Sequence, residues 1–527
     1  MRDFHLPGRS TVYAERGMCA TSHPLAAATA IDTLKAGGNA VDAAIAAAVL
    51  LGICEPQMTG IGGDAFALVH PGPDQPILAL NASGRAPAAL SAAALRARGF
   101  ETMPTDIPEA VTIPGAVDGF FALSGRFGRL GMDRLLAPAI DYAERGVPVA
   151  PRTAFDWADE ADRLQGAGIN YYLRDGRALR PGEVFRAPQQ AQALRRIAAQ
   201  GPAAFYEGEI AEDMLAGLGP DAPHRLEDFA ASVGGSDWGE PVTGRYKGWE
   251  IVEHPPNGQG AAALLLLDII ARLKIENLDP LGAARAHLEA EATKLAYDAR
   301  NRLLADPAHM PDPAALQAPG LASELAATIN PTRALPRGLV QEGAPHRDTI
   351  YITVVDENRM AVSLIYSIFA SFGTGIASPK FGILMHNRGS GFSLSAGHPN
   401  EAAGGKRPMH TIIPGMVRQG PHMGLSFGVM GGPYQAAGHA RLITNLVDYG
   451  MELQDALDAP RTFAFDGALR VERGYSDAVR ADLQARGHEV VVPAAPIGGA
   501  QAIAIDGVTG LLTAASDPRK DGIALGY

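Results

Sequence analysis

Residues 348–356 of this chain read Asp-Thr-Ile-Tyr-Ile-Thr-Val-Val-Asp. β-Branched and aromatic residues dominate the run, which predicts a β-strand. Thr349 stands at the first position of that strand, directly after the polar, flexible segment 341–347. About two thirds of the 527 residues precede Thr349 and one third follow it. The stretch therefore places a threonine at the head of a strand, where the chain is accessible enough to be cut.

A cut between Asp348 and Thr349 would give Thr349 a free α-amino group beside its own hydroxyl. That amine can act as the general base that activates the hydroxyl, so one residue would supply both nucleophile and base. Many threonines open a strand without such a role, and single-residue motifs give many false matches. The stretch alone leaves both interpretations of Thr349 open.

Other segments with motif-like spacing follow one another along the chain. They are Glu55-Pro56-Gln57, Gly60-Ile61-Gly62-Gly63-Asp64, Leu80-Asn81-Ala82-Ser83-Gly84-Arg85-Ala86-Pro87, Pro114-Gly115-Ala116-Val117-Asp118-Gly119, Phe372-Gly373-Thr374-Gly375 and Gly431-Gly432. Together with the threonine-headed strand, they resemble the γ-glutamyltranspeptidase family of N-terminal nucleophile hydrolases. The resemblance runs from about Gly17 to the C-terminal Gly-Tyr, nearly the whole chain.

The resemblance implies an α/β (α+β) fold, a four-layer αββα sandwich of the N-terminal nucleophile hydrolase type. It also implies a proenzyme that cuts itself before Thr349. The products would be a large (α) subunit, 1–348, and a small (β) subunit, 349–527, which form one intertwined unit. The implied chemistry is hydrolysis of an amide bond with neither a metal ion nor an organic cofactor. The oligomeric state stays open, including a higher oligomer of the paired subunits.

The composition excludes several classes of protein. A hydrophobic fraction of 47% is ample for a large core. The net charge of −12 argues against general nucleic-acid binding, which needs a basic face. Cys19 and Cys54 are too few for a disulfide framework and have no partner at metal-ligand spacing, which favours two buried thiols. The expected ligand is a small-molecule substrate.

Targeting and membrane signals are weak. Residues 1–10 contain no apolar segment of the kind found in a secretory signal. The longest apolar run, 261–271, is too short to span a bilayer and includes Asp268, so it predicts a buried helix. We therefore expect a cytoplasmic protein without a membrane partner.

Local patterns predict several secondary-structure elements. Residues 24–52 are alanine-rich and helical in pattern, with a break at Gly37-Gly38 and Asn39 as the cap of a second helix. The runs 349–355 and 361–368 are typical of paired strands. Further elements are predicted as strands at 412–417 and 425–430 and as amphipathic or surface helices at 129–145, 188–200 and 284–304.

Thr349 is the expected nucleophile for both self-cleavage and turnover. Attack on an amide carbonyl builds negative charge on oxygen, which needs preorganised N–H donors. Gly431-Gly432 matches the family's oxyanion-hole pair, and glycine lets the backbone approach closely, although a simple turn is the alternative. Ser367 lies where the family usually has a second threonine that hydrogen-bonds the nucleophile, and its hydroxyl can keep that role.

The substrate pocket departs from the family pattern. Family members hold the α-carboxylate of a γ-glutamyl group with an arginine, and Ser83 stands at that position here. The acidic residue that holds the α-ammonium is replaced by Gly391, the paired serines by His410-Thr411, and an asparagine by Phe369. Desolvating an ammonium group without a partner is costly, so we expect a pocket that no longer selects amino-acid zwitterions.

Arg388, His410 and Arg85 are the polar or cationic groups that the pocket has gained. Arg85 is predicted to share a strand face with Ser83, two residues earlier, and to replace the lost arginine. A guanidinium suits a carboxylate because its donors form a planar fork. A structural ion pair is the alternative for both arginines, and a structural hydrogen-bonded histidine is the alternative for His410.

These features predict an amidohydrolase whose substrate carries a carboxylate but no α-amine, and oxamate, hydrolysed to oxalate and ammonia, fits that description. The alternatives are glutathione hydrolysis or γ-glutamyl transfer in a rearranged pocket, and removal of a β-lactam side chain. A non-enzyme alternative is a homologue that binds a ligand and never matures. The presence of Thr349, Ser367 and Gly431-Gly432 argues against that last alternative.

Overall fold

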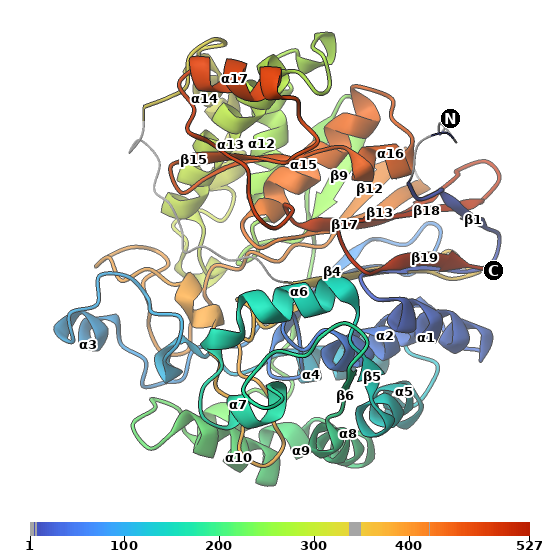
Figure 1. Ribbon diagram of the computed structural model, residues 1–527, viewed down its shortest axis with the longest axis vertical. Coiled ribbons are helices and arrows are strands. Elements are labelled where there is room, and N and C mark those ends of the chain that lie inside the picture. The colour runs from blue at the N-terminus through green and yellow to red at the C-terminus, as the bar shows by residue number, and fades with distance from the viewer. Residues whose placement is uncertain (1–4, 6–7, 337–348, 421) are drawn as a thin grey trace.

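Two β-sheets packed face to face form the centre of the molecule (Figure 1). The computed structural model describes residues 5, 8–336, 349–420 and 422–527. The first sheet has seven strands in the order β1 (Val12–Ala14), β18 (Leu512–Ser516), β17 (Gly499–Ile505), β13 (His422–Met430), β12 (Gly415–Gln419), β9 (Trp249–Glu253) and β8 (Val242–Tyr246). The second also has seven, in the order β19 (Ile523–Gly526), β2 (Met18–Thr21), β10 (Ile350–Val355), β11 (Ala361–Ser367), β3 (Asp64–His70), β4 (Leu78–Ala82) and β7 (Asp237–Gly239).

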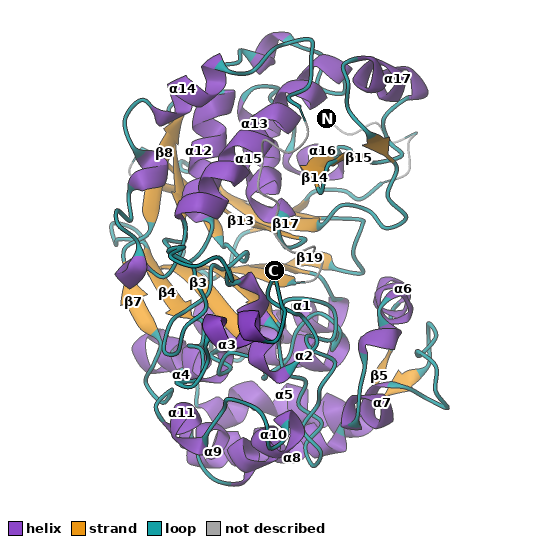
Figure 2. Cartoon of the chain, turned by 90° about the vertical axis from the view of Figure 1, so that its left-hand side faces the viewer, coloured by secondary structure: helices purple, strands orange, loops and turns teal. Residues whose placement is uncertain are grey.

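Helices cover the outer face of each sheet, so the fold has four layers, helix–sheet–sheet–helix (Figure 2). The helices on the side of the second sheet are α1 (Pro24–Lys35), α2 (Ala40–Cys54) and α4 (Ala116–Phe127), with α5 (Met132–Arg145) packed on α2 and α8 (Pro188–Gln200) packed on α5. The helices on the first sheet are α12 (Gly260–Ile270), α13 (Ala283–Leu303), α15 (Tyr434–Val447) and α16 (Leu453–Asp458). The predicted αββα sandwich is confirmed.

Shorter elements complete the described part of the chain. The other α-helices are α3 (Ala92–Ala97), α6 (Pro151–Asp159), α7 (Ala167–Tyr172), α9 (Ala203–Tyr206), α10 (Glu209–Leu218), α11 (Leu226–Ala230), α14 (Leu321–Ala327) and α17 (Asp477–Ala485). The 3-10 turns are η1 (Pro108–Ala110), η2 (Ala161–Arg163), η3 (Ile275–Asn277), η4 (Pro307–His309), η5 (Ala315–Gln317) and η6 (Arg388–Gly391). Two small sheets contain β14 (Thr462–Phe465), β15 (Ala468–Val471) and β16 (Val490–Val491), and β5 (Val147–Pro148) and β6 (Val184–Phe185).

β10 and β11 are the central antiparallel pair of the second sheet, as the sequence predicts. Every residue of both strands is buried, because one face meets the helices and the other meets the first sheet. Alternate residues of β10 point to opposite faces. Tyr351 packs between the sheets and Thr353 donates a hydrogen bond to Ser426 of β13, 2.7 Å away. Odd-numbered positions of β10 therefore face β13.

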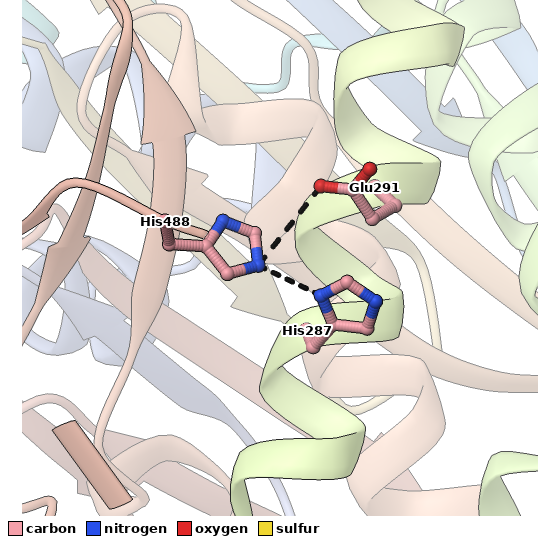
Figure 3. A group of neighbouring side chains, drawn as sticks. All are labelled: His287, Glu291 and His488. Carbon is pink, nitrogen blue, oxygen red and sulfur yellow. Dashed lines mark hydrogen bonds and ion pairs between the residues drawn. The ribbon is translucent and has the colours of Figure 1, made fainter. Parts of the chain in front are cut away.

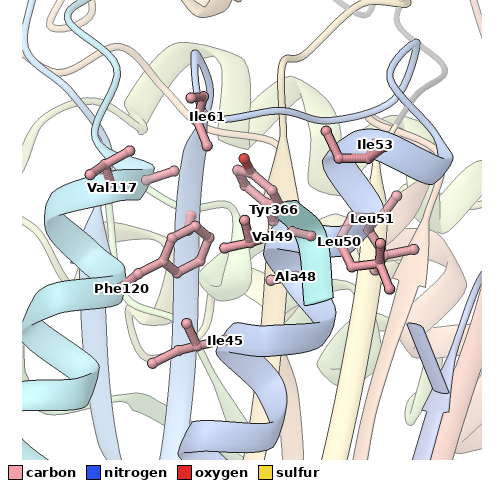
Figure 4. Packing of buried hydrophobic residues seen from close by; sticks show 14 of the residues in the cluster. Ile45, Ala48, Val49, Leu50, Leu51, Ile53, Ile61, Val117, Phe120 and Tyr366 are labelled. Atoms are coloured by element: carbon pink, nitrogen blue, oxygen red, sulfur yellow. The ribbon is translucent and has the colours of Figure 1, made fainter. Parts of the chain in front are cut away.

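The predicted break and cap before α2 are confirmed. The Asn39 side chain accepts a hydrogen bond from the Asp42 N–H, and the Asp42 carboxylate accepts one from the Asn39 N–H, both at 3.0 Å. All residues of α2 are buried, since the helix lies between the second sheet and the outer helices. Figure 4 shows its side chains beside Phe120 of α4 and Tyr366 of β11, whose rings meet edge to face at 5.2 Å.

Each sheet combines strands from both sides of Thr349. β10 pairs with β2 on one side and β11 on the other, and β11 pairs with β3. In the first sheet β13 pairs with β12, which pairs in turn with β9 from the earlier part of the chain. The two parts thus share one core. Cys19 and Cys54 are buried and unpaired, and none of the described helices is long and apolar enough to cross a membrane.

The contact between the sheets gives a stability prediction. A Cβ on Gly428 of β13 would lie 2.3 Å from Cε2 of the buried Tyr351 ring, so Gly428→Ala forces the two sheets apart. We expect the free energy of unfolding to fall by about 1–3 kcal/mol, as overpacked cores do. Gly125→Ala is the matched control, because an exposed position inside α4 has no atom within 4 Å of the added carbon. Equal thermal midpoints for both variants would contradict the prediction.

Candidate active site

Thr349 lies directly before β10 and, like the odd-numbered residues of that strand, faces β13. Its side chain is fully buried. The Oγ1 atom lies 3.3 Å from Oγ of Ser367, which is its cross-strand neighbour at the end of β11. It also lies 3.5 Å from Nε2 of Gln435, in the first turn of α15. The hydroxyl is thus held by one group from β11 of the second sheet and one from helix α15. Asp348, the other side of the expected cut, lies outside the described residues.

Gly431-Gly432 forms the tight turn between β13 and α15. Both residues have a positive φ, 116° and 55°, which glycine adopts without strain. A Cβ on Gly431 would also lie 2.8 Å from Cα of Gly498. In the described part of the chain neither N–H of the pair donates to another protein group. Gln435 donates its backbone N–H to Gly432 O at 3.1 Å and contacts Thr349 with its side chain, so the turn lies beside the hydroxyl.

Residues from α12 and α13 fix this turn. Gln259, at the start of α12, donates from Nε2 to the carbonyl oxygens of Thr411 at 2.6 Å and Gly432 at 3.3 Å. Its Oε1 accepts a hydrogen bond from the buried Arg300 at 2.6 Å, and Tyr297 donates to the Pro433 carbonyl. These bonds fix the turn that carries the two glycine N–H groups, and N–H donors held in fixed positions are what an oxyanion requires.

Arg388 is fully buried in η6, above the ring of Phe369 at 4.2 Å. Its Nη1 donates to Oγ1 of Thr411 at 3.1 Å, whereas Nε and Nη2 have no hydrogen-bond partner among the described residues. Burial lowers its pKa to about 9, which leaves it cationic near neutral pH. A buried guanidinium with two unused donors is costly unless an anion joins it.

The loop that supports Arg388 is strained. Phe369, just past β11, has φ of 76°, a left-handed conformation that bulky residues rarely adopt. Its N–H donates to Ser367 Oγ at 2.9 Å, so the strained residue is tied to the serine beside Thr349. Such outliers persist only where the surroundings enforce them, and they concentrate at functional sites. This loop therefore couples the position of the guanidinium to the position of Thr349.

Asp64 is a buried carboxylate at the centre of this region, opposite Ser367 in the sheet register. Its Oδ2 lies 3.2 Å from Nε2 of His410 and 3.4 Å from Nδ1 of His386. Burial alone raises the pKa of Asp64, but His386, His410 and Arg388 together hold it below its usual range. Burial, with Arg388 nearby, lowers the pKa of His410 to about 3, so its imidazole is neutral. His410 Nδ1 has no partner among the described side chains.

Two of the predicted substrate contacts are placed differently from the expectation. β4 ends at Ala82, so Ser83 and Arg85 do not share a strand face, and that prediction is wrong. Arg85 is 49% exposed and forms ion pairs with Asp306 at 3.5 Å and Asp237 at 3.8 Å. Ser83 is buried, but its hydroxyl donates to Asn81 at 2.7 Å. Arg85 is thus a surface ion-pair residue.

The structure brings together most of the site residues that were predicted from the sequence. They are Thr349, Ser367, Gly431-Gly432, Arg388 and His410-Thr411. Roles for Asp64, His386 and Gln435 were not predicted. Asp64 is the last residue of the motif Gly60–Asp64, which was used for the family resemblance without a role for the carboxylate. Gln435 follows the glycine pair by three residues, so it lay next to a motif already in view. His386, two residues before Arg388, carried no comparable signal.

Comparison with known proteins agrees with this geometry. The sequence profile of the gamma-glutamyltranspeptidase family matches residues 26–527. The chain belongs to this family. It has the N-terminal nucleophile hydrolase fold, and it is an enzyme that acts on amide bonds.

Relatives within the family carry different names. The glutathione hydrolase-like YwrD proenzyme of Bacillus subtilis (strain 168) is 33% identical and is matched over 98% of this chain and 99% of its own length. The oxamate amidohydrolase proenzyme of Klebsiella pneumoniae subsp. pneumoniae is 35% identical, over 98% of this chain and 100% of its own. The crystal structure of cephalosporin acylase from Bacillus halodurans is 36% identical with a TM-score of 0.91, covering 100% of this chain and 99% of that one.

The buried carboxylate gives a second stability prediction. Asp64→Ala leaves Arg388 without its nearest negative charge and His410 without its acceptor. Removing one member of a buried charged group costs about 3–5 kcal/mol, so we expect a large drop in the thermal midpoint. Asp221→Ala is the control, because substitution of an exposed residue usually changes stability by no more than about 0.5 kcal/mol. Similar thermal midpoints for the two variants would mean that Asp64 does not stabilise the buried charged group.

Proposed function

We propose that the chain is processed between Asp348 and Thr349 and that the new N-terminal Thr349 is the catalytic residue. The buried position of its hydroxyl, between Ser367 and Gln435 and beside the glycine turn, supports this proposal. Relatives that cover nearly the whole chain are named as proenzymes, which is consistent with processing into two subunits from one precursor.

The chemistry follows from these positions. The α-amine of Thr349 takes the proton of Oγ1 as the oxygen attacks the substrate carbonyl carbon. The carbonyl oxygen becomes an oxyanion, which the N–H groups of Gly431 and Gly432 stabilise. The protonated amine returns the proton to the leaving nitrogen, the C–N bond breaks and ammonia or an amine departs. Water then attacks the ester on Thr349 in the same way and releases a carboxylate.

We infer that the substrate is a small amide that carries a carboxylate, with oxamate as the leading candidate. The observation that carries this inference is Arg388, a fully buried cation with two unused donors. A carboxylate would accept both and neutralise the guanidinium. Asp64 is the nearest acid, but its oxygens already accept from Gly84 N–H at 2.9 Å and Gly115 N–H at 3.0 Å, besides the histidines. An α-ammonium therefore finds no free partner beside Arg388.

A β-lactam side-chain acylase is the second candidate. It is favoured by the similarity to the cephalosporin acylase, whose fold matches this chain with a TM-score of 0.91. Glutathione hydrolysis and γ-glutamyl transfer are weaker alternatives, because Ser83 and Gly391 supply no charge for the α-carboxylate and α-ammonium. All these reactions use the same Thr349 chemistry, and only the acyl group differs.

Processing is tested by intact-mass analysis of the purified protein. We expect two fragments, residues 1–348 and 349–527. Thr349→Ala should remain one chain without activity because it has no hydroxyl, and Thr349→Ser should process slowly because it keeps one. An uncut protein with full amidase activity would exclude this mechanism.

Substrate choice is tested by ammonia release from oxamate and glutamine, together with assays for cleavage of glutathione and a cephalosporin. Oxamate should give the highest kcat/KM. Arg388→Leu should lower that value by roughly one to two orders of magnitude, since a charge-assisted contact contributes about 1.5–3 kcal/mol. Arg85→Leu, which removes a surface arginine paired with Asp237 and Asp306, should leave it unchanged. A larger effect of Arg85→Leu, or a preference for glutathione, would refute the pocket assignment.

A further inference from the structure

A second cluster of polar side chains lies on α13, outside the Thr349 site (Figure 3). His287 and Glu291 stand one turn apart on the helix, and His488 reaches them from the segment after α17. His488 Nε2 lies 2.8 Å from His287 Nδ1 and 4.0 Å from Glu291 Oε1. All three side chains are buried. Two imidazoles and a carboxylate thus point at one another.

The spacing of these atoms suits a divalent metal ion. The ligand atoms all lie within 4.8 Å of one another. Nitrogen and oxygen atoms bound at about 2.0–2.1 Å to a tetrahedral zinc ion lie about 3.3–3.4 Å apart. The two separations from His488 Nε2, 2.8 Å and 4.0 Å, fall on either side of that value, and all three ligand atoms lie within 4.8 Å of one another, so the side chains must rotate to close around an ion.

The outer contacts of the cluster are those that a metal ligand needs. His287 directs Nε2 at the carbonyl oxygen of Asn330, 2.8 Å away. As this nitrogen carries the proton, Nδ1 keeps its lone pair and accepts a hydrogen bond from His488 Nε2–H. A metal ion would replace that hydrogen bond, with the His488 proton moving to its other ring nitrogen. The backbone N–H of Leu335 donates to Oε2 of Glu291 at 2.6 Å, which orients the other oxygen, Oε1, toward His488. Such outer hydrogen bonds fix the tautomer and direction of ligands in metal sites.

We propose that His287, Glu291 and His488 bind a zinc-type divalent ion, with water as the fourth ligand. Two imidazole nitrogens and one carboxylate oxygen form a donor set that zinc favours. The sequence pattern predicted no metal cluster, because His488 lies far from the other two ligands along the chain. None of the three residues touches Thr349 or the groups around it, so the role is structural.

The position of the site shows what the ion would hold together. His287 and Glu291 precede Thr349, and His488 follows it. Asn330 and Leu335, which contact the ligands, belong to the last described segment before the expected cut. Arg486 fastens the same segment through Pro331 O at 2.8 Å. A bound ion would therefore link the end of the large part of the chain to the small part.

Lys294 competes with a metal ion for the carboxylate of Glu291. Its Nζ lies 2.6 Å from Glu291 Oε1, the oxygen that faces His488, and so it occupies part of the ligand's capacity. A metal must share this oxygen with the ammonium or displace it. Lys294→Gln removes the competing charge while keeping a polar side chain of similar reach. This variant gives the proposal a test in which affinity is expected to rise.

The test is zinc binding to the full-length protein, stripped with EDTA and titrated with ZnCl2 by isothermal titration calorimetry. We expect one site per chain. His488→Ala should weaken binding by at least about 100-fold, since it removes a direct ligand. His309→Ala, at an exposed histidine on η4, should change nothing. Lys294→Gln should bind several-fold more tightly.

A second ligand variant keeps the proposal testable if His488→Ala fails to fold. Glu291→Gln keeps an acceptor for the Leu335 N–H but loses the charge, and it too should bind weakly. Zinc should raise the thermal midpoint of the unsubstituted protein and of His309→Ala but not of Glu291→Gln, because the ion binds only the folded state. Absence of stoichiometric zinc binding, or binding that survives both His488→Ala and Glu291→Gln, would overturn the proposal.

Discussion

The face-to-face packing of the two sheets is the constraint on which the site depends. Each strand at the centre is covered on both faces, so every second side chain of β10 must enter the space between the sheets. Gly428 leaves room there for the Tyr351 ring, and Thr353 bonds across to Ser426. Thr349 lies two positions before Tyr351, so strand alternation directs its side chain to the same face. Thr349 consequently faces the end of β13, where the glycine turn begins.

Charge burial is the second organising feature. Water is excluded around Arg388 and Asp64, and groups in such surroundings interact strongly with whatever charge remains nearby. Asp64 is saturated by backbone amides and His410, whereas Arg388 retains unused donors. The region therefore contains a buried cation whose hydrogen-bonding capacity is only partly used. Phe369 fixes the position of that cation, because its strained backbone connects Ser367 to the guanidinium.

The parts of the fold that were predictable from sequence have local causes. The strand pair around β10 and the Asn39 cap follow from side-chain alternation and a capping pattern within a few residues. Arg85 was misplaced because β4 ends at Ala82, and strand ends are the least certain part of a sequence pattern. The role of Asp64 and the contacts of His488 were not predicted, because their partners come from distant segments that only the sheet register and helix packing bring together.

Both sheets draw strands from either side of the Asp348–Thr349 bond, and this arrangement dictates an order of events. A fragment beginning at Thr349 would leave β10 without β2 and β11 without β3, with bare edges on both. Folding must therefore precede any cut of that bond. After such a cut the fragments would stay joined along two continuous sheets, and parting them would be the same process as unfolding. The stability of the cut protein would therefore depend on its concentration, as it does for obligate dimers that have no folded monomer.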